Sequence, residues 1–289
     1  MTAPSGEQFE IGHGEQRLCA VEVGGGVRTY RSGDRDVLLG YALDEMCTGG
    51  RGQVLAPWPN RIEDGAYAFD GRTLQLPLTE PEKRNAIHGL VRWTTWRAVE
   101  HEVSSVALEH VLHPQPGYPF TLALRVEYRL DDAGLTVEST ATNVGSGACP
   151  LGLGHHPYLA GAVDELTVRV PARDQIVADE RGLPEGRGPA ALHEPQRIGA
   201  RRIDTAFAEL KRDLDGLARV RVGDAVLWLD HAFPFVQLFT GDLPGIDRRG
   251  LAVEPMTCAP NAFRTGEGLL RLEPGESFRG RWGIHPASP

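Results

Sequence analysis

Apolar and polar residues alternate along much of this chain. The clearest example is segment 121–130, TLALRVEYRL, in which every second residue is apolar. A period of two places one set of side chains on each face of a strand, so this segment is predicted to be a half-buried strand. The turn residues Asp131-Asp132-Ala133-Gly134 follow it. Segment 135–144 is therefore predicted to return as the neighbouring antiparallel strand.

Short runs of the same kind recur between clusters of Gly, Pro, Asp and Asn. They are 18–23, 37–43, 103–112, 166–170, 218–222, 225–229, 236–240 and 278–284. The glycine run at 24–26 is predicted to be a hairpin turn, and only 203–211 has a helix-like pattern. Many short strands with almost no helices between them predict an all-β fold. We expect a large antiparallel β-sandwich with very few short helices.

Composition supports one folded unit rich in turns. The 289 residues include 35 Gly and 21 Pro, which fits many tight turns between short strands. The Pro- and Gly-rich segment 181–189 is predicted to be a long surface loop rather than a linker. With no other linker, tract or repeat in view, residues 1–289 are predicted to form a single domain.

Charge and cysteine content exclude several classes of protein. The formal net charge is −9, and the densest basic feature is the pair Arg201-Arg202, so nucleic-acid binding is not expected. No stretch approaches the ~20 apolar residues of a membrane helix, and the N-terminus does not resemble a secretory signal. The four cysteines form no C-x-x-C pair, which indicates reduced thiols and a cytoplasmic location rather than two disulfides.

Four segments depart from the strand pattern and concentrate chemically active side chains. They are Pro57-Trp58-Pro59-Asn60-Arg61-Ile62, 85–90 around His88, Gly152 to Leu159 with His155-His156-Pro157-Tyr158, and 251–255 around Glu254. Polar groups held among rigid or apolar neighbours are typical of functional loops.

Glu254 and the histidines offer acid–base chemistry. Val253 and Pro255 flank Glu254, so partial desolvation should raise its pKa and make it a usable base. Histidine can donate a proton near neutral pH. Each residue also has an alternative structural role. Arg61 could form an ion pair with Glu63 or Asp64, and Glu254 could be an exposed carboxylate at the end of a strand. Trp58 could be a core residue rather than a ring that stacks on a ligand.

Motifs for metals and nucleotides are weak or absent. His110 and His113 have roughly the spacing of metal ligands, but no third His or Cys lies near them in the sequence. No phosphate-binding P-loop and no G-x-S-x-G motif occurs. We therefore expect no metal and no cofactor.

The active segments, in their order along the chain, resemble the signature positions of the aldose 1-epimerase (galactose mutarotase) family. The similar motifs are Asn60-Arg61-Ile62, His88-Gly89, His156-Pro157-Tyr158 and Glu254-Pro255, with Ile203-Asp204-Thr205-Ala206-Phe207 resembling the L-D-x-x-F segment and 181–186 the P-x-G loop. The resemblance implies the galactose mutarotase-like supersandwich. It also implies cofactor-free interconversion of α and β anomers of a free sugar.

Roles follow from the resemblance residue by residue. Glu254 would be the general base on the C1 hydroxyl, His156 the general acid on the ring oxygen, and His88 a support for that acid. Sugar-binding side chains would come from Arg61, Asp204, Asn60, His155 and Tyr158. Consecutive strand residues point to opposite faces, so of His155 and His156 the acid is assigned to the residue in the H-x-Y motif.

The resemblance leaves the substrate open. The acidic chain favours a free hexose such as glucose or galactose, whereas Arg51, Arg61 and Arg92 near the motifs keep a sugar phosphate possible. Two further alternatives are a non-catalytic sugar-binding or regulatory module and a glycoside hydrolase using Asp204 and Glu254. The partner is expected to be a small sugar, and the protein a monomer or homodimer.

Overall fold

Antiparallel strands make up the structure, as the period of two predicts. A computed structural model describes residues 2–286, and within them the strands form six sheets of nine, eight, four, two, two and two strands. The expected all-β, antiparallel architecture is confirmed. Within those residues no helix has the length and apolar character needed to cross a bilayer.

The nine-stranded sheet carries the long alternating strands. Its order is β10 (Arg97–His101), β11 (Ser105–Leu112), β12 (Leu122–Asp131), β13 (Gly134–Asn143), β27 (Ser277–His285), β23 (Ala225–Leu229), β22 (Ala218–Val222), β17 (Thr167–Arg169) and β20 (Gln196–Arg197). β12 and β13 pair over their full length, from Leu122–Asn143 to Asp131–Gly134. The apolar set of β12 is buried and the alternate set is not, which confirms the half-buried hairpin.

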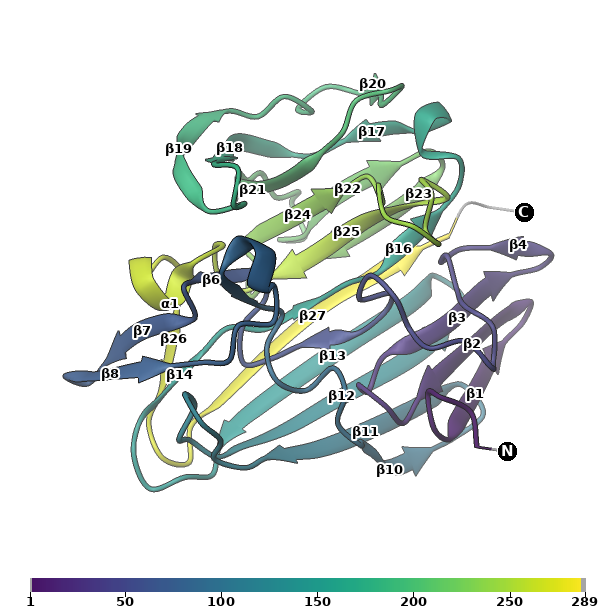
Figure 1. The fold of residues 1–289 in the computed structure, drawn as a ribbon. Coiled ribbons are helices and arrows are strands. Elements are labelled where there is room, and N and C mark those ends of the chain that lie inside the picture. Colours follow the sequence, from purple (N-terminus) through teal and green to yellow (C-terminus); the bar gives the residue numbers. More distant parts are fainter. Residues whose placement is uncertain (1, 287–289) are drawn as a thin grey trace.

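The eight-stranded sheet carries two of the four active segments, those of His156 and Glu254. Its order is β19 (Pro184–Pro189), β18 (Ala172–Ala178), β21 (Asp204–Leu210), β24 (Phe235–Phe239), β25 (Gly250–Met256), β15 (Gly154–His155) and β5 (Val54–Leu55), with β16 (Tyr158–Ala160) also paired to β25. Figure 1 shows β24 and β25 above the long strands β13 and β27, and one apolar cluster joins the facing sheets.

Smaller elements complete the fold. The N-terminal sheet is β1 (Gln8–His13), β2 (Gln16–Val21), β3 (Val27–Ser32) and β4 (Arg35–Asp36). The two-stranded sheets pair β6 (Arg61–Glu63) with β9 (Asn85–Ile87), β7 (Ala66–Phe69) with β8 (Arg72–Gln75), and β14 (Cys149–Leu151) with β26 (Leu270–Leu272). The helices described are α1 (Ala262–Thr265) and the 3-10 turns η1 (Pro81–Lys83) and η2 (Val163–Glu165). The glycine run joins β2 to β3, as predicted.

Segment 203–211 is not a helix, contrary to the prediction. It forms β21, in which Phe207 packs in the main core while Ala206 and Ala208 pack in a second apolar cluster. Both faces of the strand are covered, and β18 and β24 take up its backbone hydrogen bonds. Burial and sheet pairing therefore outweigh the local helical pattern.

Two other segments also differ from prediction. Residues 37–43 are not a strand, because the chain crosses between sheets there: Val37 N–H donates to the Tyr30 carbonyl and Leu39 N–H to the Tyr158 carbonyl. The predicted loop 181–189 is a loop only at its start. From Pro184 onward it is β19, an edge strand paired with β18, and an edge tolerates its prolines.

The turn after β9 aims a predicted site residue. His88 has φ +61° and Gly89 φ +70°, both in the left-handed region. The His88 N–H donates to the Asn60 carbonyl and the Leu90 N–H to the Ala56 carbonyl. A Cβ on Gly89 would lie 2.1 Å from the Ala56 oxygen, so only glycine fits this position.

Gly89→Ala is expected to lower the free energy of unfolding by about 2 kcal/mol or more, because it adds a backbone clash to an unfavourable φ. Urea unfolding measures the change. Gly71→Ala is the matched control: its φ is +72° and nothing lies within 4 Å of the added Cβ. Gly71→Ala should cost only about 1 kcal/mol, and equal losses in the two variants would contradict the clash.

Candidate active site

The active segments converge on one cavity of about 440 Å³, a size typical of small-molecule sites. Asn60 and Arg61 enter it from the start of β6, His88 from the turn after β9, and Glu254 from β25. His156 and Tyr158 come from the β15–β16 segment and Asp204 from the start of β21. The structure thus brings together seven of the eight side chains singled out from the sequence.

Glu254 and His156 form the innermost pair of the cavity. His156 Nε2 lies 3.3 Å from Glu254 Oε1, and both side chains are at least 95% buried. Every residue of β25 is buried, so Glu254 is a carboxylate inside an interior strand rather than at an exposed strand end. Its Oε2 and His156 Nδ1 are buried without a hydrogen-bond partner among the described residues. Unmatched buried groups of this kind are poised to bind a ligand.

Tyr158 holds the His156 ring. The two rings stack with centroids 5.0 Å apart and an interplanar angle of 10°. The Tyr158 hydroxyl donates to the Gly49 carbonyl at 2.9 Å, which anchors the tyrosine. Tyr158 lines the cavity as expected, but its hydroxyl is already engaged, so in this structure it orients the histidine.

Asn60 sets the orientation and tautomer of His88. The Asn60 backbone N–H donates to His88 Nδ1 at 3.2 Å, which makes Nδ1 an acceptor. The proton of a neutral His88 therefore sits on Nε2, available as a donor. The Asn60 side-chain oxygen accepts the backbone N–H of Arg61. His88 also packs edge-on against His156, with ring centroids 5.2 Å apart.

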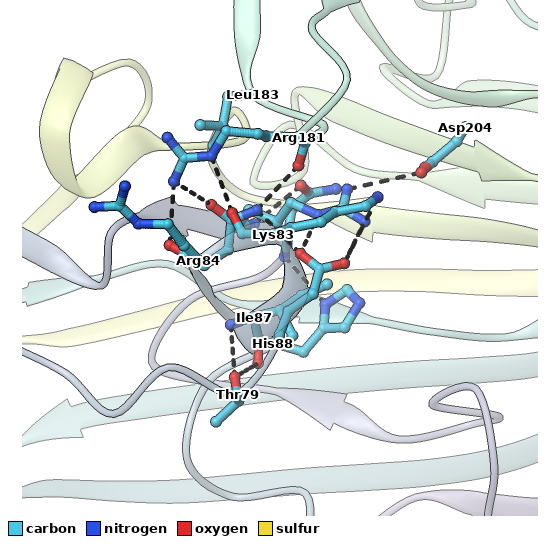
Figure 2. Close-up of polar contacts among 12 residues, drawn as sticks. Thr79, Lys83, Arg84, Ile87, His88, Arg181, Leu183 and Asp204 are labelled. Carbon is cyan, nitrogen blue, oxygen red and sulfur yellow. Dashed lines mark hydrogen bonds and ion pairs between the residues drawn. The ribbon is translucent and has the colours of Figure 1, made fainter.

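Arg61 is held by Glu80 and Asp204. Its Nε and Nη2 donate to the two Glu80 carboxylate oxygens at 2.8 and 3.0 Å, and Nη1 lies 3.7 Å from Asp204 Oδ2. Figure 2 shows Asp204 reaching this network from a different element than His88 and Lys83. The expectation that Arg61 could pair with Glu63 or Asp64 is wrong, because those carboxylates pair with other arginines, among them Arg181.

The loop before β19 closes this side of the network. Arg181 donates from Nε to the Lys83 carbonyl, and the Asn85 side chain donates to the Arg181 carbonyl. A Cβ on Gly182 would lie 2.5 Å from Arg61 Nη1, so the loop backbone passes directly beside the guanidinium. Gln237 on β24 donates to Asp204 Oδ1 at 2.5 Å. Arg61 and Asp204 are therefore positioned before any ligand arrives.

His155 is not in the cavity, which corrects its predicted role in sugar binding. Its Nε2 lies 2.8 Å from the Ser139 hydroxyl on β13, in the core between the two large sheets. Its strand neighbour His156 faces the cavity, as alternation of side chains requires. Trp58 is likewise a core residue: it is buried and packs edge-on against Phe263.

Burial sets the electrostatics of the site. Desolvation raises the pKa of Glu254 well above its ordinary value, and the charge of Asp204 adds to that, while Arg61 opposes it. Burial lowers the pKa of His156 to about 3, with a further contribution from Arg92. The pKa of His88 also lies well below its usual range, through burial and the neighbouring His156, Arg92 and Arg61. The desolvated glutamate inferred from the sequence is confirmed.

His88, His156 and Glu254 also have the composition of a metal-binding set. One donor atom from each lies within 4.8 Å of the others, and two histidines with a glutamate are a known zinc set. The 3.3 Å separation of His156 and Glu254 equally suits a shared proton. The geometry therefore permits a cation here, although none was expected from the sequence.

Sequence reasoning did not find Glu80 or Gln237. Glu80 lies 19 residues from Arg61 in a stretch of mixed charge, and Gln237 sits within an apolar strand. Their roles come from backbone pairing. Glu80 bridges to Asn85 at the start of β9, which pairs with the β6 strand of Arg61, and β24 pairs with β25 so that Gln237 faces Glu254. A single sequence carries no signal for that pairing.

Comparisons with known proteins show what the chain is similar to. A family model described as aldose 1-epimerase matches residues 7–285. The uncharacterized protein YihR of Escherichia coli is 36% identical, with 95% of this chain and 92% of that protein covered.

Solved structures show the same fold. The GalM/aldose epimerase homologue of C. elegans has a TM-score of 0.85 at 17% identity, covering 98% of this chain and 99% of the other. The galactose 1-epimerase of Lactobacillus acidophilus has a TM-score of 0.78 at 18% identity, covering 96% and 93%. The expected galactose mutarotase-like fold is confirmed.

The buried His155 predicts a specific acid sensitivity. Burial lowers the pKa of His155 to about 3 from an ordinary 6.5, so the unfolded chain binds a proton that the folded chain rejects. Its contribution to stability is present above pH 6.5 and is lost as the pH falls toward 3. In His155→Gln, the decline of the unfolding free energy between pH 6.5 and 4.5 should be shallower by on the order of 1 kcal/mol per pH unit.

Urea unfolding at a series of pH values measures these slopes. His113→Gln, at an exposed histidine, is the matched control and should keep the wild-type slope. An unchanged slope in His155→Gln would show that this histidine does not govern the acid response.

Proposed function

The chain belongs to the aldose 1-epimerase family, and on that premise we propose that it interconverts the α and β anomers of an aldose by opening and reclosing the sugar ring. The observation that carries the proposal is the buried contact between His156 Nε2 and Glu254 Oε1, 3.3 Å apart at the cavity. Ring opening needs one group to remove a proton and another to supply one. This pair provides both.

The pair holds one exchangeable proton over a wide pH range. Burial disfavours both ionised forms, so the pKa of Glu254 rises while that of His156 falls. Between those two values the pair carries a single proton. At neutral pH the carboxyl group and the imidazole therefore share one proton, and the pair needs no third ionisable group.

The pair is reactive when its single proton has crossed the 3.3 Å contact to His156, which leaves Glu254 as a carboxylate. Glu254 takes the proton of the C1 hydroxyl, the C1–O5 bond breaks as the C1 carbonyl forms, and His156 supplies a proton to O5. The C1–C2 bond then rotates. On reclosure the O5 hydroxyl attacks the other face of the carbonyl, its proton returns to His156, and Glu254 returns the proton to O1. Atoms and protons balance, and the reaction consumes nothing.

The remaining side chains orient the sugar. His88 has its Nε2 proton free because Asn60 occupies Nδ1, so it can donate to the ring oxygen beside His156. Asp204 supplies an acceptor and Arg61 a donor for hydroxyls, both already held by Glu80 and Gln237. A hexose such as glucose or galactose is the first substrate class to test. The four buried free thiols support a cytoplasmic location.

Glu254→Gln and His156→Asn are each expected to lower kcat/KM by about 10²–10⁴-fold, because each removes one partner in proton transfer. Polarimetry of freshly dissolved α-D-glucose and α-D-galactose measures the rate. Glu185→Gln and His113→Asn, which change exposed residues away from the cavity, are matched controls. No acceleration by folded wild-type protein on any aldose would overturn the proposal.

Chelation tests the alternative that His88, His156 and Glu254 bind a metal ion. Because acid–base ring opening needs no cation, dialysis against EDTA is expected to leave the rate of mutarotation unchanged. Metal analysis of the dialysed protein checks that removal is complete. A loss of activity restored by a divalent cation would instead assign His88, His156 and Glu254 to that ion.

A further inference from the structure

Three cationic side chains line the cavity, and two of them already have carboxylate partners. Arg61 makes two hydrogen bonds to Glu80 and faces Asp204, so its charge is balanced. Lys83 Nζ lies 3.8 Å from the same Glu80. The third is Arg92.

Arg51, the other arginine near the sequence motifs, takes no part in the cavity. Its guanidinium bonds to Glu45, to the Thr48 hydroxyl and to the Gly40 carbonyl, and it is buried in its own loop. It therefore has a structural role.

Arg92 has no such partners. Its Nε is buried without a hydrogen-bond partner, and no carboxylate forms an ion pair with it among residues 2–286. Burial lowers the pKa of Arg92, and the nearby Cys47 thiol is uncharged at neutral pH because burial raises its pKa to about 11. Guanidinium remains protonated even so. Arg92 is partly buried, and a buried donor without an acceptor is costly unless a ligand supplies one.

The backbone that carries Arg92 is clamped. The Gln53 side chain donates to the Arg92 carbonyl at 2.8 Å. The Gly24 N–H donates to the Thr94 carbonyl, and a Cβ on Gly24 would lie 2.6 Å from the Arg92 oxygen. The N-terminal sheet and the β5 segment therefore fix this turn, so Arg92 is placed before a ligand binds.

Arg92 lies on the histidine side of the cavity. Its charge lowers the pKa of both His88 and His156, whereas the charges that act on Glu254 are those of Asp204 and Arg61. In the proposed reaction His156 serves the ring oxygen. The carbon bonded to that oxygen, on the side away from C1, carries the exocyclic carbon C6 of a hexopyranose. A substituent at C6 would therefore extend toward Arg92.

We propose that Arg92 binds an anionic group on the exocyclic carbon of the sugar, so that the preferred substrate is a negatively charged aldose. This inference rests on the proposed anomer interconversion for its placement of the ring. The shared chemistry is a group with two or more anionic oxygens, which the planar guanidinium binds through parallel N–H donors. Carboxylate, phosphate and sulfonate all meet that description.

The test measures the rate of mutarotation by NMR exchange between the two anomers. It compares glucose with three anionic counterparts that carry a carboxylate, a phosphate or a sulfonate at C6. Wild-type protein should have at least about tenfold higher kcat/KM for one anionic sugar than for glucose, and Arg92→Gln should lower that ratio by about 10- to 100-fold. Comparison of the three anionic sugars identifies which anionic group Arg92 binds. Arg92→Lys keeps the positive charge but lacks the two parallel N–H donors of a guanidinium. Its ratio of kcat/KM for the anionic sugar to kcat/KM for glucose should therefore be intermediate.

Arg97→Gln is the matched control. It removes the same charge from an exposed arginine on β10, which pairs with Glu109 at 3.8 Å, and should leave the ratio unchanged. Circular dichroism confirms that each variant is folded. A wild-type ratio at or below one, or equal losses for glucose and the anionic sugars in both Arg92 variants, would overturn the inference while leaving the proposed function standing.

Calorimetric titration separates the two proposals if no sugar is turned over. Failure to accelerate any aldose overturns the proposed function. Binding of an anionic sugar that weakens at least tenfold in Arg92→Gln would then still support Arg92 as the anion site, and absence of binding by any anionic sugar would overturn it.

Discussion

The site depends on one buried carboxylate. Glu254 occupies the middle of β25, an interior strand with every residue buried, and its nearest titratable partner is His156 at 3.3 Å. A carboxylate in such surroundings cannot ionise as readily as in water. The surrounding residues determine how Glu254 shares a proton with His156. Because the two groups share that proton, a desolvated carboxylic acid and a neutral imidazole together form a reactive pair.

The rest of the cavity keeps this pair in place with contacts made elsewhere. Tyr158 stacks on His156 and is anchored by Gly49, while the Asn60 backbone holds His88. None of these contacts needs a ligand. A site assembled in this way loses little conformational entropy when a sugar binds, which favours catalysis by rigid placement.

Charge is distributed unevenly around the pair. On the Glu254 side, Arg61 and Lys83 balance the charges of Glu80 and Asp204, and that network suits uncharged hydroxyl groups. On the histidine side, the buried Nε of Arg92 has no hydrogen-bond partner among residues 2–286. In the proposed reaction, protons are transferred at C1 and O5 whereas the exocyclic group binds at Arg92, so different residues would set the reaction and the preferred sugar.

The sequence by itself determined the antiparallel fold and most of the site. Strand alternation predicted the β12–β13 hairpin, and the apolar neighbours Val253 and Pro255 predicted that Glu254 is desolvated. Both predictions rest on residues adjacent in the chain, whereas the burial of Glu254 itself comes from the elements packed around β25. Tertiary structure alone decided that 203–211 is a strand, that His155 belongs to the core, and that Glu80 rather than Glu63 or Asp64 holds Arg61. It also singled out Arg92 among the three arginines near the motifs. These outcomes depend on which strands pair and in what register, and on which charges are brought within 4 Å. Contacts between residues far apart in the chain set both, so no local pattern encodes them.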